Sequence, residues 1–157
     1  MDGIFKTVPT IFRQMYTIHA PVGGKNNSRI LPLVYALMTR KSEELYRGLF
    51  ESIIKFAEEN CVQLKPLNII TDFEITAINM SRYKFSDANN RGCFFHFNKN
   101  GWRQIQNCGL ATRYGNDEHF SIMLRHLFAL AFLPAHEIPA AFDNLKPEIP
   151  SEAKDVM

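Results

Sequence analysis

The feature that most constrains the fold is a change of hydrophobic period near residue 42. Residues 42–60 carry apolar side chains at positions 45, 46, 49, 50, 53, 54 and 57, which form a helical stripe. Ser42 stands where the N-cap of this helix is expected. The helix leads through Lys65-Pro66 to the apolar stretch 67–71, which is typical of a strand. A strand, a long helix and a further strand form a crossover, so the strand at 67–71 is predicted to run parallel to its sheet neighbour.

Three stretches before this helix also favour strands, at 4–8, 11–22 and 29–39. The second is rich in β-branched and aromatic residues, and the third is mostly apolar, which is typical of a central strand. The turn cluster GGKNNS at 23–28 separates these two. The short connections predict an antiparallel meander of three strands.

The rest of the chain alternates helices with one more strand. The expected elements are a helix at 73–84, a strand at 91–97, and helices at 98–109, 116–131 and 135–145. The order is then βββαβαβα with further helices. This order predicts an α/β fold: the ribonuclease H-like mixed sheet of five strands, with an additional C-terminal helical segment. We expect a core at 1–110, a helical insertion or extension at 111–145, and a polar, disordered tail at 146–157.

The bulk composition describes an ordinary globular chain. Of 157 residues, 46% are apolar and 22% are charged. The net charge of +2 is too small to indicate nucleic-acid binding by the overall charge of the chain, but it leaves a local basic patch possible. The three cysteines and the lack of a secretory leader predict a reduced, intracellular location. No apolar run approaches the roughly 18 residues that a membrane span needs. No tight Lys/Arg cluster gives a nuclear address.

The stretch LNIITDFE places Asp72 at the end of an apolar strand. In the predicted sheet the first and fourth strands are neighbours, so Asp2 and Asp72 would face each other. Two such carboxylates repel unless a cation lies between them, and Mg²⁺ prefers these oxygen ligands. The residues alone favour a plainer interpretation, a capping box in which Thr71 is the N-cap and Glu74 reaches back. For Asp2 the plainer interpretation is a frayed terminal turn.

Several motifs together resemble one family. DGIFKTVPTIFRQMYTIHA at 2–20, IITDFEITAIN at 69–79 and RGCFFHFNKNGWRQIQ at 91–106 resemble, in order, motifs of the Mutator-like element (MULE) transposase domain. Ile4 stands where that family usually has Thr. The similarity covers about residues 2–145.

The resemblance implies a nuclear DNA transposase core that uses an Asp-Asp-Glu triad with Mg²⁺ or Mn²⁺ and acts on transposon ends. Asp2 matches the first acid and Asp72 the second, both as catalytic metal ligands. The third acid of the family lies in a motif like Thr-Asn-Asn-x-x-Glu, which nothing here matches. The remaining candidate acids lack its flanking residues; they are Glu118, Glu137, Glu148 and Glu152.

We therefore expect a transposase fragment with weak or no strand cleavage. The alternative is a non-catalytic nucleic-acid-binding or protein-binding module derived from a transposase. Neither hypothesis requires a small-molecule cofactor.

Cys93 and His96 form a Cys-x-x-His motif with three interpretations. They could be half of a zinc site completed by Cys108 and His119, but that second pair is poorly spaced and zinc is disfavoured. They could be a buried cysteine and a hydrogen-bonded structural histidine. The family resemblance favours a third role, in which His96 lies near the metal site and orients a ligand or a DNA phosphate.

Arg91, Lys99 and Arg103 are the candidate DNA-binding residues. Lys99 and Arg103 are four residues apart on one expected helix and share a face. Together with Arg91 they could contact DNA phosphate, and the commoner alternative is a solvated helix face. The apolar helix at 120–133 is expected to be core; exposure of its face in a fragment would favour self-association.

Overall fold

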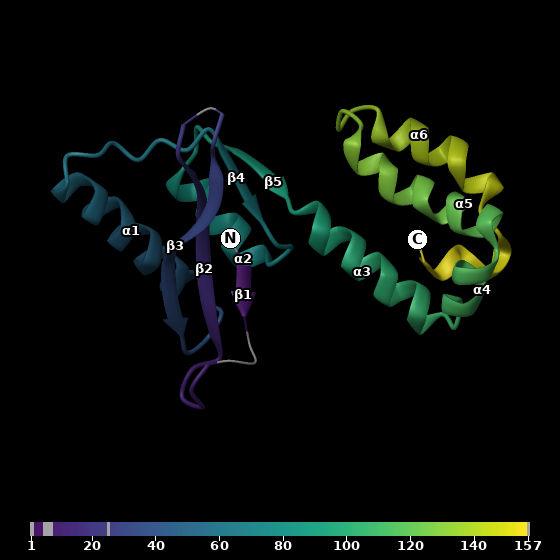
Figure 1. Cartoon of the computed structure of the whole chain (residues 1–157), viewed down its shortest axis with the longest axis horizontal. Coiled ribbons are helices and arrows are strands. Elements are labelled where there is room, and N and C mark those ends of the chain that lie inside the picture. Colours follow the sequence, from purple (N-terminus) through teal and green to yellow (C-terminus); the bar gives the residue numbers. More distant parts are fainter. Residues whose placement is uncertain (1, 5–7, 25, 157) are drawn as a thin grey trace. The chain divides into compact units, whose positions relative to one another are not determined.

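A computed structural model of the chain describes the backbone of residues 2–4, 8–24 and 26–156, and the side chains of the latter two ranges (Figure 1). The chain divides into two compact units, Met1–Cys93 and Phe94–Met157. This boundary lies earlier than the expected one at residue 110. The reason is that the helix beginning at Phe94 packs against helices of the second unit.

The first unit is an α/β domain. Its elements are β1 (Asp2–Ile4), β2 (Gln14–Val22), β3 (Arg29–Met38), α1 (Glu43–Glu59), β4 (Asn68–Thr71), α2 (Ile75–Lys84) and β5 (Asn89–Gly92). With α3 (Phe94–Asn107) of the second unit, the order along the chain is the predicted βββαβαβα.

The strands form two sheets in the part of the chain that the structure describes. The predicted meander is confirmed as an antiparallel sheet with the order β1-β2-β3. The pair β4-β5 is parallel, as expected for strands joined by a crossover. The single five-stranded sheet is not shown, because the described pairings join β4 to β5 and not to β1. β1 and β4 have only three and four residues, which leaves few ladder hydrogen bonds to join the sheets.

Helix α1 confirms the prediction from the hydrophobic stripe. Ser42 is its N-cap, and the Ser42 hydroxyl accepts a hydrogen bond from the Leu45 N–H at 3.4 Å. Its buried residues, Tyr46 and Phe50, pack in the core of the first unit, where the Tyr46 ring meets Tyr16 edge-on at 5.0 Å. The buried cluster is Tyr16, Met38, Tyr46, Phe50, Ala77 and Met80.

The stretch RGCFFHF differs from its prediction as a strand over 91–97. β5 ends at Gly92, and Phe94–Phe97 form the first turn of α3. Aromatic content favours a strand, but from Phe94 to Ile105 the apolar residues also recur at helical spacing. His96 therefore lies in a helix rather than at the end of a strand.

The second unit is helical. After α3 it contains α4 (Ala111–Asn116), α5 (Glu118–Ala129), η1 (Leu130–Phe132), α6 (Ile138–Leu145), η2 (Lys146–Glu148) and η3 (Ser151–Val156). The helix expected at 116–131 starts two residues later, because Asp117 is its N-cap and accepts a hydrogen bond from the Phe120 N–H at 3.0 Å.

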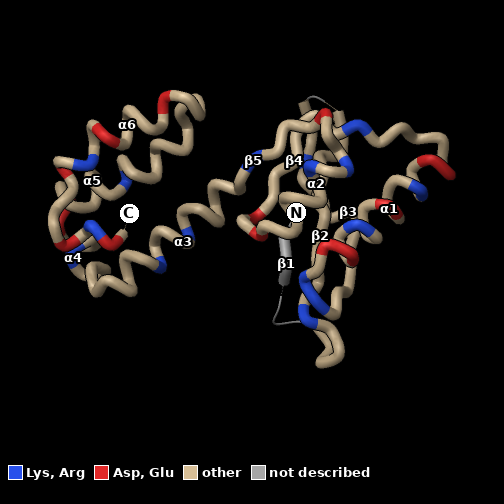
Figure 2. The backbone as a smooth tube through the Cα atoms, turned by 180° about the vertical axis from the view of Figure 1, so that it is seen from behind, with Lys and Arg blue, Asp and Glu red and all other residues tan. Residues whose placement is uncertain are grey.

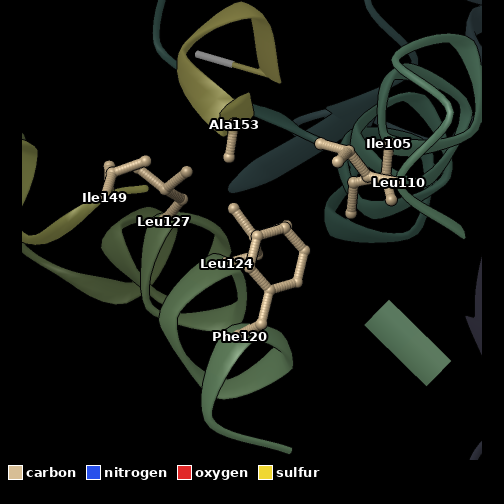
Figure 3. Packing of buried hydrophobic residues seen from close by; sticks show 7 residues of the cluster. All are labelled: Ile105, Leu110, Phe120, Leu124, Leu127, Ile149 and Ala153. Carbon is tan, nitrogen blue, oxygen red and sulfur yellow. The ribbon is translucent and has the colours of Figure 1, made fainter. Parts of the chain in front are cut away.

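An apolar cluster forms the core of the second unit (Figure 3). Its buried members are Ile105, Leu110, Phe120, Leu124, Leu127, Ile149 and Ala153. The tail after residue 145 therefore differs from the expectation of disorder. It forms η2 and η3, and it places Ile149 and Ala153 against α5, where apolar burial offsets the cost of ordering the chain.

Strand β3 exposes several apolar side chains. Tyr35 and Leu37 alternate with the inward residues Ala36 and Met38 and are 60% and 49% exposed; beyond the register shift between Ile18 and His19 of β2, Leu31 and Leu33 are 43% and 55% exposed. The helix expected as core at 120–133 is buried only in part: Phe120, Met123, Leu124 and Leu127 are buried, whereas Ile122, Phe132 and Leu133 are exposed. Across the described residues, no helix has the length and apolarity that a membrane crossing requires.

Candidate nucleic-acid and metal site

The carboxyl ends of β4 and β5 meet at one edge of their sheet. The Cys93 N–H donates a hydrogen bond to the Thr71 carbonyl at 2.8 Å, which extends the parallel ladder by one step. Asp72, Phe73 and Glu74 follow Thr71 as a short loop before α2. In α/β domains this edge of a parallel sheet is where ligands bind.

Asp72 forms a local turn with its own loop. It is half-buried, and its Oδ1 accepts a hydrogen bond from the Glu74 N–H at 3.3 Å. This is the pattern of an Asx turn. The capping-box interpretation is wrong: Thr71 lies in β4, and Glu74, not Thr71, is the N-cap residue of α2 and makes no side-chain cap bond.

The Glu74 carboxylate is held by two other elements. It forms an ion pair with Lys41, which precedes α1, and it accepts a hydrogen bond of 2.6 Å from the Tyr46 hydroxyl on α1. The Tyr46 hydroxyl in turn accepts a hydrogen bond of 2.8 Å from Gln14 Nε2 on β2. These contacts fix Glu74, two positions after Asp72. The loop is therefore held by Lys41, by Tyr46 on α1 and, through Tyr46, by Gln14 on β2.

Tyr46 stays protonated in this setting. Burial raises the pKa of the Tyr46 hydroxyl well above its ordinary value, and the hydrogen bond to Glu74 raises it further. The hydroxyl is therefore a reliable donor to the Glu74 carboxylate over the whole physiological pH range.

Phe73 is fixed by close approach to β5. A Cβ placed at Gly92 would lie 2.8 Å from Cζ of the Phe73 ring, so the ring can lie against the strand only because position 92 has no side chain. Each of the three loop residues thus makes its own contact: Asp72 with the Glu74 N–H, Phe73 with Gly92, and Glu74 with Lys41 and Tyr46.

A pocket of about 230 Å³ lies at this edge and is lined by two arginines. Arg91 on β5 is one of the predicted DNA-binding residues, and Arg82 on α2 was not predicted. The other lining residues are Thr71, Phe73, Ile78, Asn90 and Gly92. Figure 2 shows basic residues at the end of α2 and at β5. Among the ion pairs of the described residues, none involves Arg82 or Arg91.

The position of Arg82 could have been found from helical spacing. Ile78 and Arg82 are four residues apart on α2 and line the same pocket. The basic residue Lys84, two positions further along α2, is used differently, since it forms an ion pair of 2.6 Å with Glu51. The pocket therefore offers two guanidinium groups, which suit bidentate binding of phosphate.

Asp2 is described only in its backbone. It lies in β1 opposite Thr17 of β2, and its side chain is outside the described side chains, as is its relation to Asp72. Asp72 is a carboxylate, the kind of oxygen ligand that a hard divalent cation prefers. In the described side chains, no cluster of three or more His, Cys, Asp or Glu residues has the arrangement of a metal site.

Cys93 and His96 lie on either side of the boundary between the compact units. Cys93 is half-buried between β5 and α3, and its backbone joins the Thr71 strand end. His96 is half-buried in α3, with its ring edge-on to Phe95 at 5.5 Å. The possible zinc partners are both in the second unit, Cys108 at the rim of the core and His119 on α5. A role of His96 at the metal site stays a prediction.

Lys99 and Arg103 are exposed on α3 in the second unit, whereas Arg91 belongs to the first. Lys99 Nζ lies 5.8 Å from the centroid of the Phe95 ring. α3 has no Asp or Glu, so its basic residues meet no acid on their own helix. The unassigned acids all lie in the second unit: Glu118 on α5, Glu137 before α6, Glu148 in η2 and Glu152 in η3, where it pairs with Arg113.

The first unit is thus an α/β domain with a carboxylate and a basic pocket at the carboxyl edge of a parallel strand pair. A sequence model of one family, the MULE transposase domain, matches residues 1–100. The chain therefore belongs to the MULE transposase family, which confirms the resemblance of its motifs. Comparison with the curated proteins and with the solved structures found no match.

Proposed function

We propose that this chain is a fragment of a Mutator-like DNA transposase core that binds DNA phosphate beside Asp72. The observation that carries the proposal is the pocket lined by Arg82 and Arg91, which reaches the carboxyl ends of β4 and β5 at Thr71 and Gly92. Asp72 follows β4 directly, so one edge offers both cationic groups for the DNA backbone and a carboxylate for a metal ion.

The ribonuclease H-like arrangement belongs to this proposal. The order βββαβαβα supports it, as does the parallel pairing of the strand after α1. In that arrangement β1 would lie beside β4, and Asp2 and Asp72 would be the residues that hold Mg²⁺ or Mn²⁺.

The residues have separate tasks in the proposed site. Asp2 and Asp72 bind the cation, and Arg82 and Arg91 hold a phosphate. Glu74, fixed by Lys41 and Tyr46, keeps the Asp72 loop in place. A bound divalent cation would activate a water or hydroxyl and stabilise the leaving oxygen of a phosphodiester.

Strand cleavage by this chain is expected to be weak or absent, because no residue matches the third acid of the family. A nicking assay on supercoiled DNA with Mg²⁺ or Mn²⁺ tests this. Robust nicking that Asp72→Ala abolishes would show that a third ligand is present after all.

Salt-dependent binding of duplex DNA tests the pocket. Arg82→Ala with Arg91→Ala should weaken binding and lower the slope of log affinity against log salt by about two, one for each phosphate that no longer pairs with an arginine. Lys55→Ala with Lys65→Ala removes the same charge from exposed positions outside the pocket and serves as control. Equal slopes for the two double variants would exclude this pocket as the DNA-binding surface.

A second function is a non-catalytic binding module derived from the transposase. DNA binding that survives both Asp2→Ala and Asp72→Ala would favour it over the metal-dependent core.

Nuclear, intracellular location and self-association are part of the proposal in either case. The exposed apolar side chains of β3 support self-association, which sedimentation of Leu33→Lys against the unchanged chain would test.

A further inference from the structure

We propose that an aromatic cavity in the second unit binds an unpaired nucleobase of single-stranded DNA. The cavity measures about 490 Å³, which is within the range of ~300–1,000 Å³ typical of small-molecule sites. Its lining residues are Phe94, Asn98, Trp102, Ile105, Tyr114, Arg125, Phe128, Ala129 and Phe132. The inference rests on the proposed function in one respect, that DNA is the ligand of this chain.

The cavity is built on the spacing of α3. Phe94, Asn98, Trp102 and Ile105 recur every three or four residues, so one face of the helix forms one wall. Residues of α5 and η1 form the opposite wall. Gly101 permits the close approach of the two walls, because a Cβ at this position would overlap the Phe128 ring.

Aromatic rings are available to stack with a planar ligand. The Phe94 and Phe132 ring centroids are 4.4 Å apart, and Trp102 meets Tyr114 at 5.3 Å. These rings are not sealed in the core: Trp102 is 38% exposed and Phe132 is 72% exposed. Base–aromatic stacking tolerates any sequence, because every base has a π face.

Two polar side chains in the wall match the remaining chemistry of a nucleotide. The half-buried Asn98 amide has both donors and an acceptor, as the edge of a base requires. Arg125 is held by a hydrogen bond of 3.2 Å from its Nε to the Tyr114 hydroxyl, and its guanidinium can meet a phosphate. Lys99 and Arg103 add positive charge on a helix without acids.

These features favour a base over a purely apolar ligand. An apolar side chain or acyl chain would leave the Asn98 amide and the Arg125 guanidinium in the wall without use, and it would gain nothing from the basic charge of α3. A paired base is hidden in the duplex stack, so the ligand is single-stranded or extruded DNA.

Trp102 is the only tryptophan of the chain, and it lies in the cavity wall, so its fluorescence reports occupancy directly. The titrants are a single-stranded oligodeoxythymidine and an abasic strand of the same length and charge. We expect saturable quenching by the first and little quenching by the second, since only bases can stack on Trp102.

Variants locate the effect. Phe132→Ala and Asn98→Ala should each weaken the quenching interaction, by about tenfold for the stacking residue Phe132. Phe95→Ala is the matched control, because Phe95 is an aromatic residue of the same helix that is 65% exposed and does not line the cavity. It should leave the quenching unchanged.

The outcomes separate this inference from the proposed function. If duplex DNA binds through Arg82 and Arg91 but the two single strands quench Trp102 equally, the base pocket is overturned and the phosphate pocket stands. If the control Phe95→Ala weakens quenching as much as Phe132→Ala does, the cavity is not the site. If no DNA of any kind binds, both proposals fail.

Discussion

The two compact units differ in what lies at the centre of their cores. In the first unit the buried residues include Gln14 and Tyr46. Gln14 donates a hydrogen bond to the Tyr46 hydroxyl, which in turn donates one to the Glu74 carboxylate. In the second unit the buried residues are apolar except for Ser121, whose hydroxyl donates a hydrogen bond only to a carbonyl of its own helix, that of Glu118. The buried polar contacts of the first unit fix the loop beside Asp72, whereas the core of the second unit is held by apolar packing.

The largest effect is expected from the apolar core. Phe120→Ala removes a ring that is 1% exposed, and it should lower the free energy of unfolding by about 3–5 kcal/mol through reduced burial and a cavity. Urea unfolding of the second unit measures this. Ile122→Ala, on the same helix but 41% exposed, should change stability by less than about 1 kcal/mol. Equal losses of stability would mean that Phe120 is not a core residue.

A smaller loss of stability is expected from the polar core. Tyr46→Phe keeps the ring but deprives the Glu74 carboxylate and the Gln14 amide of a partner, which should cost about 1–3 kcal/mol. Tyr83→Phe removes a hydroxyl from a residue that is 67% exposed and is the control. If both variants unfold at the same urea concentration, the network does not stabilise the first unit.

The same network predicts a pH dependence above pH 10. Because burial raises the pKa of Tyr46 above that of an unfolded tyrosine, about 10, the unfolded state loses its proton first. The stabilising contribution is complete below pH 10 and is lost as pH rises toward the folded pKa. Chemical unfolding at pH 9 to 11 should show a steeper decline for the unchanged chain than for Tyr46→Phe. Parallel curves would contradict a raised pKa.

The smallest effect is expected at the N-terminus of α5. The hydrogen bond from the Phe120 N–H lowers the pKa of the Asp117 carboxyl, and the neighbouring Arg113 lowers it to a smaller extent. Its contribution to stability is therefore present above the ordinary pKa of about 4 and is lost as pH falls through the lower, folded value. Asp117→Ala should reduce helicity slightly and remove this acid dependence, as circular dichroism would show. Asp117→Asn keeps the acceptor and should preserve the helicity.

Local patterns in the sequence were sufficient for most of the first unit. The stripe after Ser42 predicted α1, and the turn clusters predicted the meander, because these signals arise from neighbours in sequence. The fate of Glu74 could not be read in this way. Its spacing from Thr71 fits a local cap, but its partners are residues about 30 positions away on other elements. In the structure the Glu74 carboxylate pairs with Lys41 and Tyr46 and makes no capping bond at the start of α2.

In the second unit, local patterns in the sequence predicted the wrong structure in two places. The composition of the tail predicted disorder, yet Ile149 and Ala153 pack in the core of the second unit, and η3 contacts α3. The aromatic run 94–97 favoured a strand but forms a helical turn after Gly92. Of the site, Asp72 was predicted at the end of its strand, where it lies, whereas Arg91 was expected at the start of a strand that in fact ends at Gly92. Arg82 was not predicted, although it shares a helix face with Ile78.

Binding of Mn²⁺ tests the central claim, that Asp2 and Asp72 share a divalent cation. Electron paramagnetic resonance of free Mn²⁺ measures how much ion the chain removes from solution. We expect that the unchanged chain binds Mn²⁺ and that Asp2→Asn and Asp72→Asn each weaken binding at least tenfold. Asp87→Asn, which changes an exposed acid between α2 and β5, should leave binding unchanged. Undiminished binding by both Asp2→Asn and Asp72→Asn would contradict this claim.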